Sequence, residues 1–412
     1  MTIRRFLFIG IVILALVVGF AGGFLFIQHQ NSSAVEDFMR QVINKETDKP
    51  TDVDFSLFWQ VWNALHDKYV DQSNLGTQKL VYGAIEGMVS AAGDDYTTFF
   101  PPEESKKFQE EISGSFSGVG LEMGERNGAI TVISPLRDTP AFRAGVMAGD
   151  VVVKIDGVST EHMALEEAVT RIRGIKGTSV VLTVLRDGET TTREFTIVRD
   201  TIKVPAIDWK LLDGHIAYVE IFIFNENVFP EFVRAAQEIL NSPADRLIID
   251  VRNNPGGLLD SAVSIAGWFL DNGSLVVKED FGNGVSHELR SDGAGQLKKY
   301  PTIVLINGGS ASASEILAGA LHDNLNTPLV GEKSFGKGSV QEIQGFYDGS
   351  SLKVTVAKWL TPNGISISEK GIEPTVLVAT PASASAESFI VGTPGKDPQL
   401  DRAIQMSNDL SR

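Results

Sequence analysis

The stretch PTIVLINGGSASASEILAGALHD, Pro301–Asp323, contains a strand, a turn and a helix in succession. The apolar, β-branched run PTIVLI predicts a buried strand that ends at Ile306. A glycine turn follows, and the remaining residues predict a helix that begins near Ser312. Strand and helix alternate in the same way after Pro205, in HIAYVEIFIF, PEFVRAAQEIL, RLIIDV, LLDSAVSIAGWFL and TPLVGE. This alternation predicts an α/β core with largely parallel strands.

The composition narrows the class of protein. A chain of 412 residues is expected to form two or more domains, and 43% hydrophobic residues are enough to bury substantial cores. The net charge of −16 argues against a nucleic-acid partner, because a phosphate backbone requires a basic surface. The absence of cysteine excludes disulfides, thiolate metal sites and a cysteine nucleophile.

The N-terminus predicts a membrane anchor. Arg4 and Arg5 precede residues 6–28, which carry no charged side chain. About 20 such residues cross a hydrocarbon core, whereas the apolar part of a signal peptide is usually about 7–15 residues long. We therefore expect a single transmembrane helix within residues 1–30 of a bacterial membrane protein, with the arginines in the cytoplasm and the rest of the chain outside it. Cleavage near residues 21–23 is the alternative, and it would leave a secreted or periplasmic protein.

Changes in composition divide the rest of the chain. The segment FSLFWQVWNALHDKYV has apolar residues at helical spacing, so we expect its aromatic stripe to lie in a core. Residues 278–299 are polar and glycine-rich and predict a surface excursion. The predicted parts are an anchor (1–30), a linker (31–50), N-terminal helices of the core (51–111), a β module (112–199), the main core (200–380) and a tail (381–412).

The β module contains short strands and one helix. The predicted strands AITVI, DVVVKI, SVVLTVL and REFTIV, with the helix ALEEAVTRIRG and the segment PAFRAGVMAGDVVVKIDG, resemble a PDZ domain in composition and order. A generic barrel with glycine turns is the alternative. Backbone N–H groups after a glycine-rich turn can hold a carboxylate, and a strand edge can pair with a peptide. The resemblance therefore implies capture of a free C-terminus by the backbone of Val119, Gly120 and Leu121.

Ser312 has two interpretations. A serine at a strand-to-helix turn has its hydroxyl beside the free N–H groups of the helix, which suits a nucleophile and its oxyanion. The pattern Ser312-x-x-Glu315 also fits a capping box, in which the serine only caps the helix. The segment alone leaves both open.

A nucleophilic serine needs a base, and no histidine is well placed for it in the sequence. His322 lies on the same predicted helix as Ser312, about 15 Å further along. His215 and His287 belong to no motif and could approach only through the fold. No H-E-x-x-H or comparable set offers a metal-activated water.

Lys337 is the alternative base. It lies in GEKSFGKGSV, Gly331–Val340, which nearly matches the nucleotide-binding loop G-x-x-x-x-G-K-[ST], but Gly338 stands where Ser or Thr is required. Glycines beside Lys337 allow a close approach of backbone, and burial can lower the pKa of a lysine enough to make it a base. A solvated loop lysine is the other interpretation.

Together, NGGSASASEILAGAL and GEKSFGKGSVQ closely resemble the C-terminal processing peptidases, or tail-specific proteases. The resemblance extends from about Phe55 to Pro374 and includes AIEGMVSAAGDDYTTFF, RGIKGTSV, DVRNNPGG and KGIEPT. It implies a crotonase/ClpP-like α/β core with an inserted PDZ domain. It also implies a dyad of Ser312 and Lys337, supported by Gln341.

Two further segments have expected roles. The glycines of DVRNNPGG could supply an oxyanion donor beside the N–H of Ala313, with Gly257 preferred over Gly256. A tight turn without chemistry is the alternative. Arg173 could contact substrate or couple the PDZ-like module to the core, or it could simply be solvated.

These features predict an extracytoplasmic serine endopeptidase that recognises protein C-termini and forms an acyl-enzyme. No cofactor, metal or nucleic acid is expected, and the expected partners are peptide or protein substrates with free C-termini and the membrane. A homo-oligomer is left open. The alternative is a non-cleaving peptide-binding scaffold or chaperone with a degenerate peptidase core.

Overall fold

The computed structural model describes residues 53–410 except 127, 137, 187, 214, 283, 369 and 381–389. The predicted anchor (1–30) and linker (31–50) lie outside the described residues. Within the described part, no helix is both long and apolar enough to cross a membrane. The chain divides into two compact units, before and after the boundary between Thr77 and Gln78.

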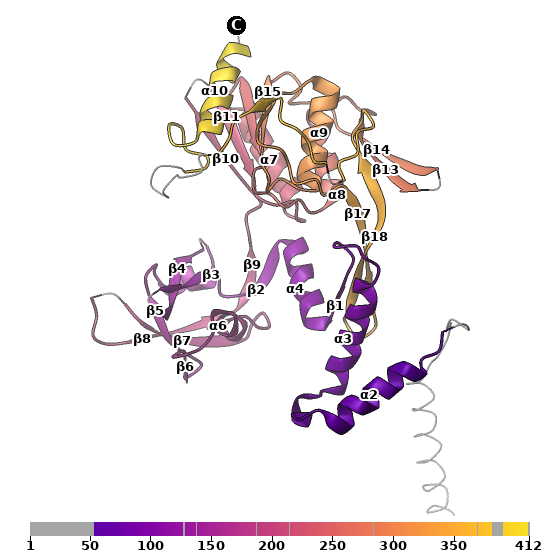
Figure 1. Ribbon diagram of the computed structural model, residues 1–412. Helices are drawn as coiled ribbons and strands as arrows, with labels where there is room; N and C mark the ends of the chain where they lie inside the picture. Colours follow the sequence, from indigo (N-terminus) through magenta and orange to yellow (C-terminus); the bar gives the residue numbers. More distant parts are fainter. Residues whose placement is uncertain are drawn as a thin grey trace, which may run out of the picture. The chain divides into compact units, whose positions relative to one another are not determined.

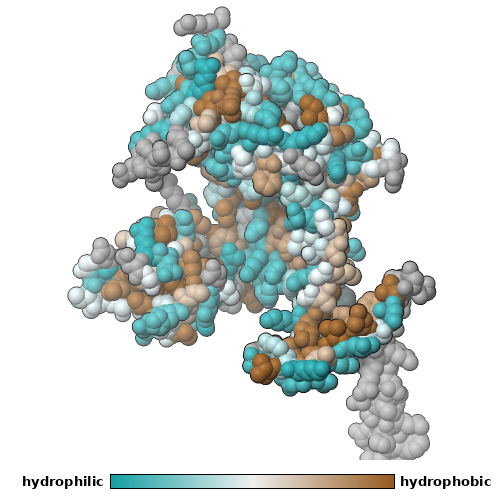
Figure 2. Space-filling view, in the orientation of Figure 1, coloured by the Kyte–Doolittle hydropathy of each residue, from teal (hydrophilic) through white to brown (hydrophobic). Residues whose placement is uncertain are grey.

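The first unit contains α2 (Ser56–Lys68) and the short 3₁₀ helix η1 (Gln72–Asn74). No residue of α2 is buried, and apolar side chains gather along it (Figure 2). Its aromatic rings contact one another, with 5.0 Å between the ring centroids of Phe58 and Trp59. The prediction that this stripe lies in a core is therefore wrong for the described chain. Helical periodicity predicts a helix correctly, but burial requires a second surface that the pattern does not specify.

The second unit contains the predicted α/β core. A six-stranded sheet has the strand order β10–β11–β12–β15–β16–β19, and three of its strands, β10, β11 and β15, are labelled in Figure 1. Only the pair β10–β11 is antiparallel, so the expectation of largely parallel strands is confirmed. The strands are β10 (Ile207–Leu212), β11 (Ile216–Ile221), β12 (Arg246–Asp250), β15 (Thr302–Ile306), β16 (Leu329–Gly331) and β19 (Val376–Leu377).

Helices cover both faces of this sheet. Alternate strand residues point to opposite faces. Val219 belongs to the larger apolar cluster, which includes buried residues of the helices α7, α8 and α9. Tyr218 belongs to a smaller cluster with Leu400 and Ala403 of α10. These helices are α7 (Val228–Leu240), α8 (Leu259–Ala266), α9 (Ala313–Leu325) and α10 (Pro398–Leu410).

A second, antiparallel sheet forms beside the core from segments distant in sequence. Its order is β1–β18–β13–β14, and β17 also pairs with β18. Residues 278–282 and 285–290, within the predicted surface excursion, belong to the hairpin β13–β14, and β14 is largely exposed. The strands are β1 (Thr98–Phe100), β13 (Leu275–Gly282), β14 (Val285–Arg290), β17 (Ser339–Gly345) and β18 (Ser351–Leu360). The helices α3 (Thr77–Ser90) and α4 (Pro102–Ser113) flank β1 in the chain.

The PDZ-like module has its own sheet and its own apolar cluster. The sheet order is β3–β4–β5–β7–β8, with β6 paired to β5, and all four predicted strands are present. The chain enters and leaves through the antiparallel pair of β2 (Ser115–Gly118) and β9 (Asp200–Lys203). The other elements are β3 (Leu121–Arg126), β4 (Ala129–Pro135), α5 (Pro140–Ala144), β5 (Val151–Ile155), β6 (Val158–Ser159), α6 (Leu165–Ile172), β7 (Ser179–Leu185) and β8 (Arg193–Val198).

Candidate active site

Ser312 lies at the junction of β15 and α9 in an uncommon backbone conformation. Its φ is 57°, a region that residues other than glycine seldom adopt outside functional sites. Ser312 lines a cavity of about 450 Å³. The other serines of the SASAS run are engaged, because the Ser310 hydroxyl donates to the Val251 carbonyl at 2.7 Å and the Ser314 hydroxyl to the Asn254 carbonyl at 3.0 Å. The middle serine, which lines the cavity, is therefore the candidate nucleophile of the run.

A single buried carboxylate fixes the backbone on both sides of this cavity. Oε2 of Glu315 accepts the backbone N–H groups of Ser312 (2.8 Å) and Lys337 (3.0 Å). Oε1 accepts the Ser334 hydroxyl (2.6 Å) and the Gly336 N–H (2.8 Å). Burial raises the pKa of the Glu315 carboxyl, and these four hydrogen bonds oppose the rise. The predicted capping box is present, and its carboxylate also ties the serine turn to the lysine loop.

The loop that resembles a nucleotide-binding loop encloses this carboxylate. Its donors, from Ser334, Gly336 and Lys337, all form hydrogen bonds with Glu315 and are therefore not available to a phosphate. A Cβ added at Gly338 would lie 2.1 Å from the backbone nitrogen of Ser368. The residue that breaks the nucleotide-loop match is therefore required by a close approach of two backbone segments.

The Lys337 side chain lines the same cavity as Ser312. Burial lowers the pKa of its amine, the nearby Lys353 lowers it further, and Glu315 opposes both effects. Its Nζ lies 5.3 Å from the ring centroid of Tyr96. Apolar residues form much of the wall: Phe108, Ile112, Phe224, Leu258, Val340 and Trp359. The half-buried position of the Lys337 side chain fits the predicted role as a base better than it fits a solvated loop lysine.

Ser312 and Lys337 face this cavity without a direct hydrogen bond between their side chains among the described residues. Catalytic pairs often have such loose geometry before substrate binds. Gln341 lines the cavity too, but its Nε2 donates to the Ser339 hydroxyl (2.7 Å) and carbonyl (3.0 Å). Its support of Lys337 therefore stays a prediction.

The turn that follows β12 passes directly beside Ser312. A Cβ added at Gly256 would lie 2.6 Å from the Ser312 Cβ and 2.9 Å from the Ala313 nitrogen. The Gly256 N–H donates to Oδ1 of Asn254 at 2.9 Å and is therefore engaged. The N–H groups of Gly257 and Ala313 have no such partner within the part of the chain that the structure describes. These two groups remain the candidate oxyanion donors.

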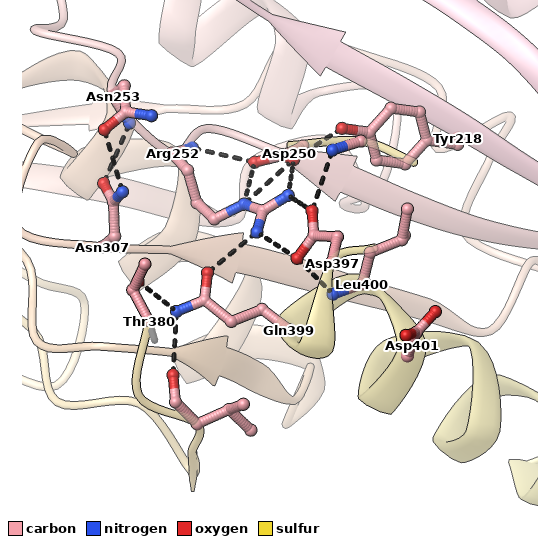
Figure 3. Close-up of polar contacts among 12 residues, drawn as sticks. Tyr218, Asp250, Arg252, Asn253, Asn307, Thr380, Asp397, Gln399, Leu400 and Asp401 are labelled. Atoms are coloured by element: carbon pink, nitrogen blue, oxygen red, sulfur yellow. Dashed lines mark hydrogen bonds and ion pairs between the residues drawn. The ribbon is translucent and has the colours of Figure 1, made fainter. Parts of the chain in front are cut away.

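A buried ion network holds the start of this turn (Figure 3). The Arg252 guanidinium donates to Asp250 (Nη2–Oδ2, 2.6 Å) and to Asp397 (Nη1–Oδ1, 2.9 Å; Nη2–Oδ2, 2.7 Å). Burial alone would lower the pKa of Arg252, but its hydrogen bonds to the two carboxylates outweigh burial and raise it. Asp397 also accepts the N–H of Leu400, in the first turn of α10. The C-terminal helix is thereby attached to the strand that leads to Gly256.

A second pair of hydrogen bonds joins the two turns of the site. The Asn253 N–H donates to Oδ1 of Asn307, and Nδ2 of Asn307 donates to Oδ1 of Asn253, both at 2.9 Å (Figure 3). Asn253 adopts a positive φ of 54° at this point. The turn after β12 and the turn after β15 therefore form one connected structure.

The predicted peptide cradle lies at an open strand edge. Val119 and Gly120 precede β3, which is an edge strand with β4 as its neighbour in the sheet. Their carbonyls accept the N–H groups of Ala141 (2.9 Å) and Leu136 (3.0 Å). Gly120 has a φ of 80°, which favours glycine. Leu121 begins β3, whose outer edge pairs with no other strand of the described residues, and such an edge can pair with an extended peptide.

Arg173 connects the PDZ-like module to α4. Its Nη1 lies 2.9 Å from Oε2 of Glu110, and its guanidinium lies 4.6 Å from the ring centroid of Phe116. Arg173 lines a second cavity of about 520 Å³, together with Leu165 and Val169 of α6. The two cavities share the lining residues Glu111, Ile223 and Asn225. The contacts of Arg173 fit the predicted coupling role, and its position also fits contact with substrate.

The histidines considered as bases lie elsewhere. His287 contacts Glu279 of β13 (Nδ1–Oε2, 3.2 Å), and His215 lies 3.9 Å from a carboxylate oxygen of Asp245. No histidine is among the described residues that line the catalytic cavity. The described residues also include no cluster of His, Asp and Glu side chains that could hold a metal ion.

The sequence did not predict a place in the site for Tyr96 or Lys353. It predicted Glu315 only as part of a helix cap and not as a contact of the lysine loop. Tyr96 belongs to DDYTTFF, a segment that the resemblance covered without giving it a role. Only the S-x-x-E spacing pointed to Glu315, and no local pattern pointed to Lys353.

Known proteins with similar sequences share this architecture. Peptidase family S41 matches residues 215–378, the PDZ domain matches residues 107–185, and the N-terminal domain of the activating protease CtpB matches residues 16–103. The carboxy-terminal processing protease CtpA of Bacillus subtilis is 40% identical over 303 residues, which are 74% of this chain and 65% of that protein. The carboxy-terminal-processing protease of Bartonella bacilliformis is 39% identical over 359 residues, 86% of this chain and 81% of that protein.

The fold is also similar to a solved structure. An S41 protease from Bacteroides fragilis superposes with a TM-score of 0.54 at 12% identity, covering 89% of this chain and 100% of that one. At this identity the likeness concerns the fold alone. The chain spans slightly less than two thirds of the length of its Bacillus relative.

Proposed function

Because the chain belongs to the carboxy-terminal processing proteases of peptidase family S41, which are serine peptidases, we propose that it cleaves protein substrates with a Ser312–Lys337 dyad. The observation that carries this proposal is the Glu315 carboxylate. It holds the backbone of both residues at the edge of one largely apolar cavity.

The proposed reaction begins with Lys337 as a neutral amine. Lys337 takes the Ser312 proton while Oγ attacks the scissile carbonyl carbon, and the N–H groups of Ala313 and Gly257 stabilise the oxyanion. The Lys337 ammonium then gives its proton to the departing amine, and an acyl-enzyme remains. Neutral Lys337 next takes a proton from the water that attacks this ester. The carboxylic acid leaves, and Ser312 regains its proton from Lys337.

We further propose that the PDZ-like module presents the substrate. A free C-terminus would pair with the edge of β3, and the upstream segment would follow the adjoining cavities to Ser312. The support is the shared lining of the two cavities and the position of Arg173 in the outer one. Peptides identical except for a C-terminal carboxylate or amide test this. We expect kcat/KM to be lower for the amide, and equal values would contradict capture of the carboxylate.

We also propose that residues 1–30 anchor the protein in a bacterial membrane with its catalytic part outside the cytoplasm. The uncharged segment after Arg4 and Arg5 supports this. Protease added to intact spheroplasts should degrade the full-length chain, and a variant without residues 1–30 should stay in the cytoplasm. A full-length chain that is protected in intact spheroplasts would contradict the proposed orientation.

The dyad is tested by Ser312→Ala and Lys337→Ala. We expect both variants to lose peptide cleavage while they still bind peptide with a free C-terminus. Lys333→Ala is the matched control, since Lys333 lies in the same loop and its Nζ is paired with Glu373 at 2.8 Å. Near-normal turnover by Lys337→Ala would overturn the dyad. Peptide binding without cleavage by the unmodified protein would favour the scaffold alternative.

A further inference from the structure

The catalytic cavity contains a second lysine that the proposed mechanism does not use. Lys353 lines the cavity together with Ser312 and Lys337. It lies on β18, opposite Ile343 of the neighbouring strand β17. The proposed base, in the loop before β17, therefore works beside a second amine, which reaches the cavity from β18.

Lys353 is held by residues that precede the PDZ-like insertion. Its Nζ lies 5.4 Å from the ring centroid of Phe100 and 5.6 Å from that of Phe108, and these rings stack 5.0 Å apart. Burial lowers the pKa of the Lys353 amine, and the carboxylate of Asp94 opposes that effect. Aromatic faces attract a cation. The rings and Asp94 together favour the ammonium form of Lys353.

Several groups determine whether Lys337 is charged. After burial, Lys353 is the next cause that lowers the pKa of Lys337, while Glu315 on α9 raises it. The four hydrogen bonds that Glu315 accepts already balance much of its charge. The Tyr96 ring faces the Lys337 amine. The remaining charged residues that line the cavity are Glu111 and Asp260.

We propose that Lys353 is a positioning residue of the dyad, whose ammonium disfavours a second ammonium in the cavity and so keeps Lys337 neutral. This rests on the proposed Ser312–Lys337 dyad. Two ammonium groups in one partly buried site repel each other, which raises the free energy of the doubly charged state. The amine whose charged form is better stabilised keeps its proton, and the other amine becomes neutral. Phe100, Phe108 and Asp94 make Lys353 that cation.

The test compares Lys353→Gln, which removes the charge, with Lys353→Arg, which retains it. A nearby charge shifts a pKa by roughly one unit. We therefore expect the acidic limb of the kcat/KM profile to move up by about one pH unit in Lys353→Gln, with about a tenfold loss below the limb. The loss should disappear at alkaline pH. The acidic limb should keep its position in Lys353→Arg. A loss of kcat/KM in Lys353→Gln that is equal at every pH would overturn the proposal.

A second measurement observes Lys337 without using catalysis. In the full-length Ser312→Ala chain, reductive methylation with ¹³C-formaldehyde gives NMR signals that titrate with each amine, and the Lys337 signal is assigned by its absence in Lys337→Arg. We expect Lys353→Gln to raise the titration midpoint of Lys337. An unchanged midpoint would overturn the role of Lys353 and leave the dyad intact. A raised midpoint with an unmoved activity limb would instead refute Lys337 as the base, and with it the proposed function.

Discussion

Glu315 accepts the backbone N–H of Lys337 at 3.0 Å, so the proposed base is positioned through its main chain, and its side chain is left free to exchange a proton. The same oxygen accepts the backbone N–H of Ser312. Helix capping and the proposed catalytic role, which are competing interpretations of the S-x-x-E pattern, are therefore compatible within one motif.

Glu315→Gln should lower kcat by about 10- to 100-fold with little change in KM. An amide nitrogen would face N–H donors that now meet a carboxylate oxygen, and unpaired donors would shift both reacting residues. Steady-state kinetics of the folded variant checks this. Glu342→Gln, at an exposed position of β17, is the control and should leave kcat unchanged. A Glu315→Gln enzyme with normal kcat would show that the carboxylate is not needed for positioning.

Lys337→Arg should lose cleavage by about 10²- to 10⁴-fold, although it keeps the positive charge. A guanidinium does not release its proton in proteins and cannot act as a base. In the unmodified enzyme, kcat/KM should rise with pH as Lys337 loses its proton. Because burial and Lys353 lower the pKa of Lys337, that rise should lie below the usual range for lysine. A profile that is flat or falls across neutral pH would contradict a neutral lysine base.

Gly256→Ala should reduce kcat by about 100-fold, because the new methyl would collide with the Ser312 Cβ and the Ala311 carbonyl, each 2.6 Å away. Gly256 also has a φ of 95°, which alanine adopts only with strain. The comparison is Gly87→Ala in α3, where no atom lies within 4 Å of an added Cβ. Cleavage assays on both variants check this, and equal activities would remove the turn after β12 from the active site.

Asp397→Asn should destabilise the core by roughly 3 kcal/mol at pH 7, because the buried Arg252 would lose a charged partner. Burial would raise the pKa of Asp397, but the hydrogen bonds and charge of Arg252 and the N–H groups of Gly392 and Leu400 outweigh it and hold the pKa below its usual range. Urea unfolding monitored by fluorescence measures the loss. Asp409→Asn, exposed on the same helix, is the control.

The lowered pKa of Asp397 also fixes the direction of its pH dependence. The ionised carboxylate stabilises the fold above the pKa of the unfolded chain, about 3.9, and this contribution is lost as pH falls through the lower folded pKa. Between about pH 5 and pH 2, the free energy of unfolding should therefore fall less in Asp397→Asn than in the unmodified protein. A variant with an unchanged acid response would show that Asp397 does not carry this stabilisation.

Much of the fold could be predicted because its signals are local. The alternation around PTIVLI predicted the parallel sheet, and the order of short strands predicted the PDZ-like module. The helical period of α2 was also correct, but the burial of its aromatic stripe was not, since periodicity does not show what covers a face. Residues 278–299 are polar, yet residues 278–282 and 285–290 belong to a β-hairpin, because cross-strand pairing can accept polar side chains on an exposed face.

The site was predictable only where its residues share a motif. Ser312 and Lys337 belong to two dense segments, and the hydroxyl bonds of Ser310 and Ser314 distinguish them from the middle serine, which lines the cavity. The antiparallel pairing of β1, β17 and β18 connects distant parts of the chain. Lys353 lines the cavity from β18, and Tyr96, which shortly precedes β1, lies near the Lys337 amine. No spacing rule within one segment could indicate them.

The position of the PDZ-like insertion has a consequence for biosynthesis. Tyr96 and Phe100 leave the ribosome before the inserted module, whereas Lys337 and Lys353 leave it after that module. A molecule that is synthesised only as far as the inserted module therefore lacks Ser312, Lys337 and Lys353. Such an order keeps the proposed dyad and its neighbouring lysine unassembled until Lys353 has been made.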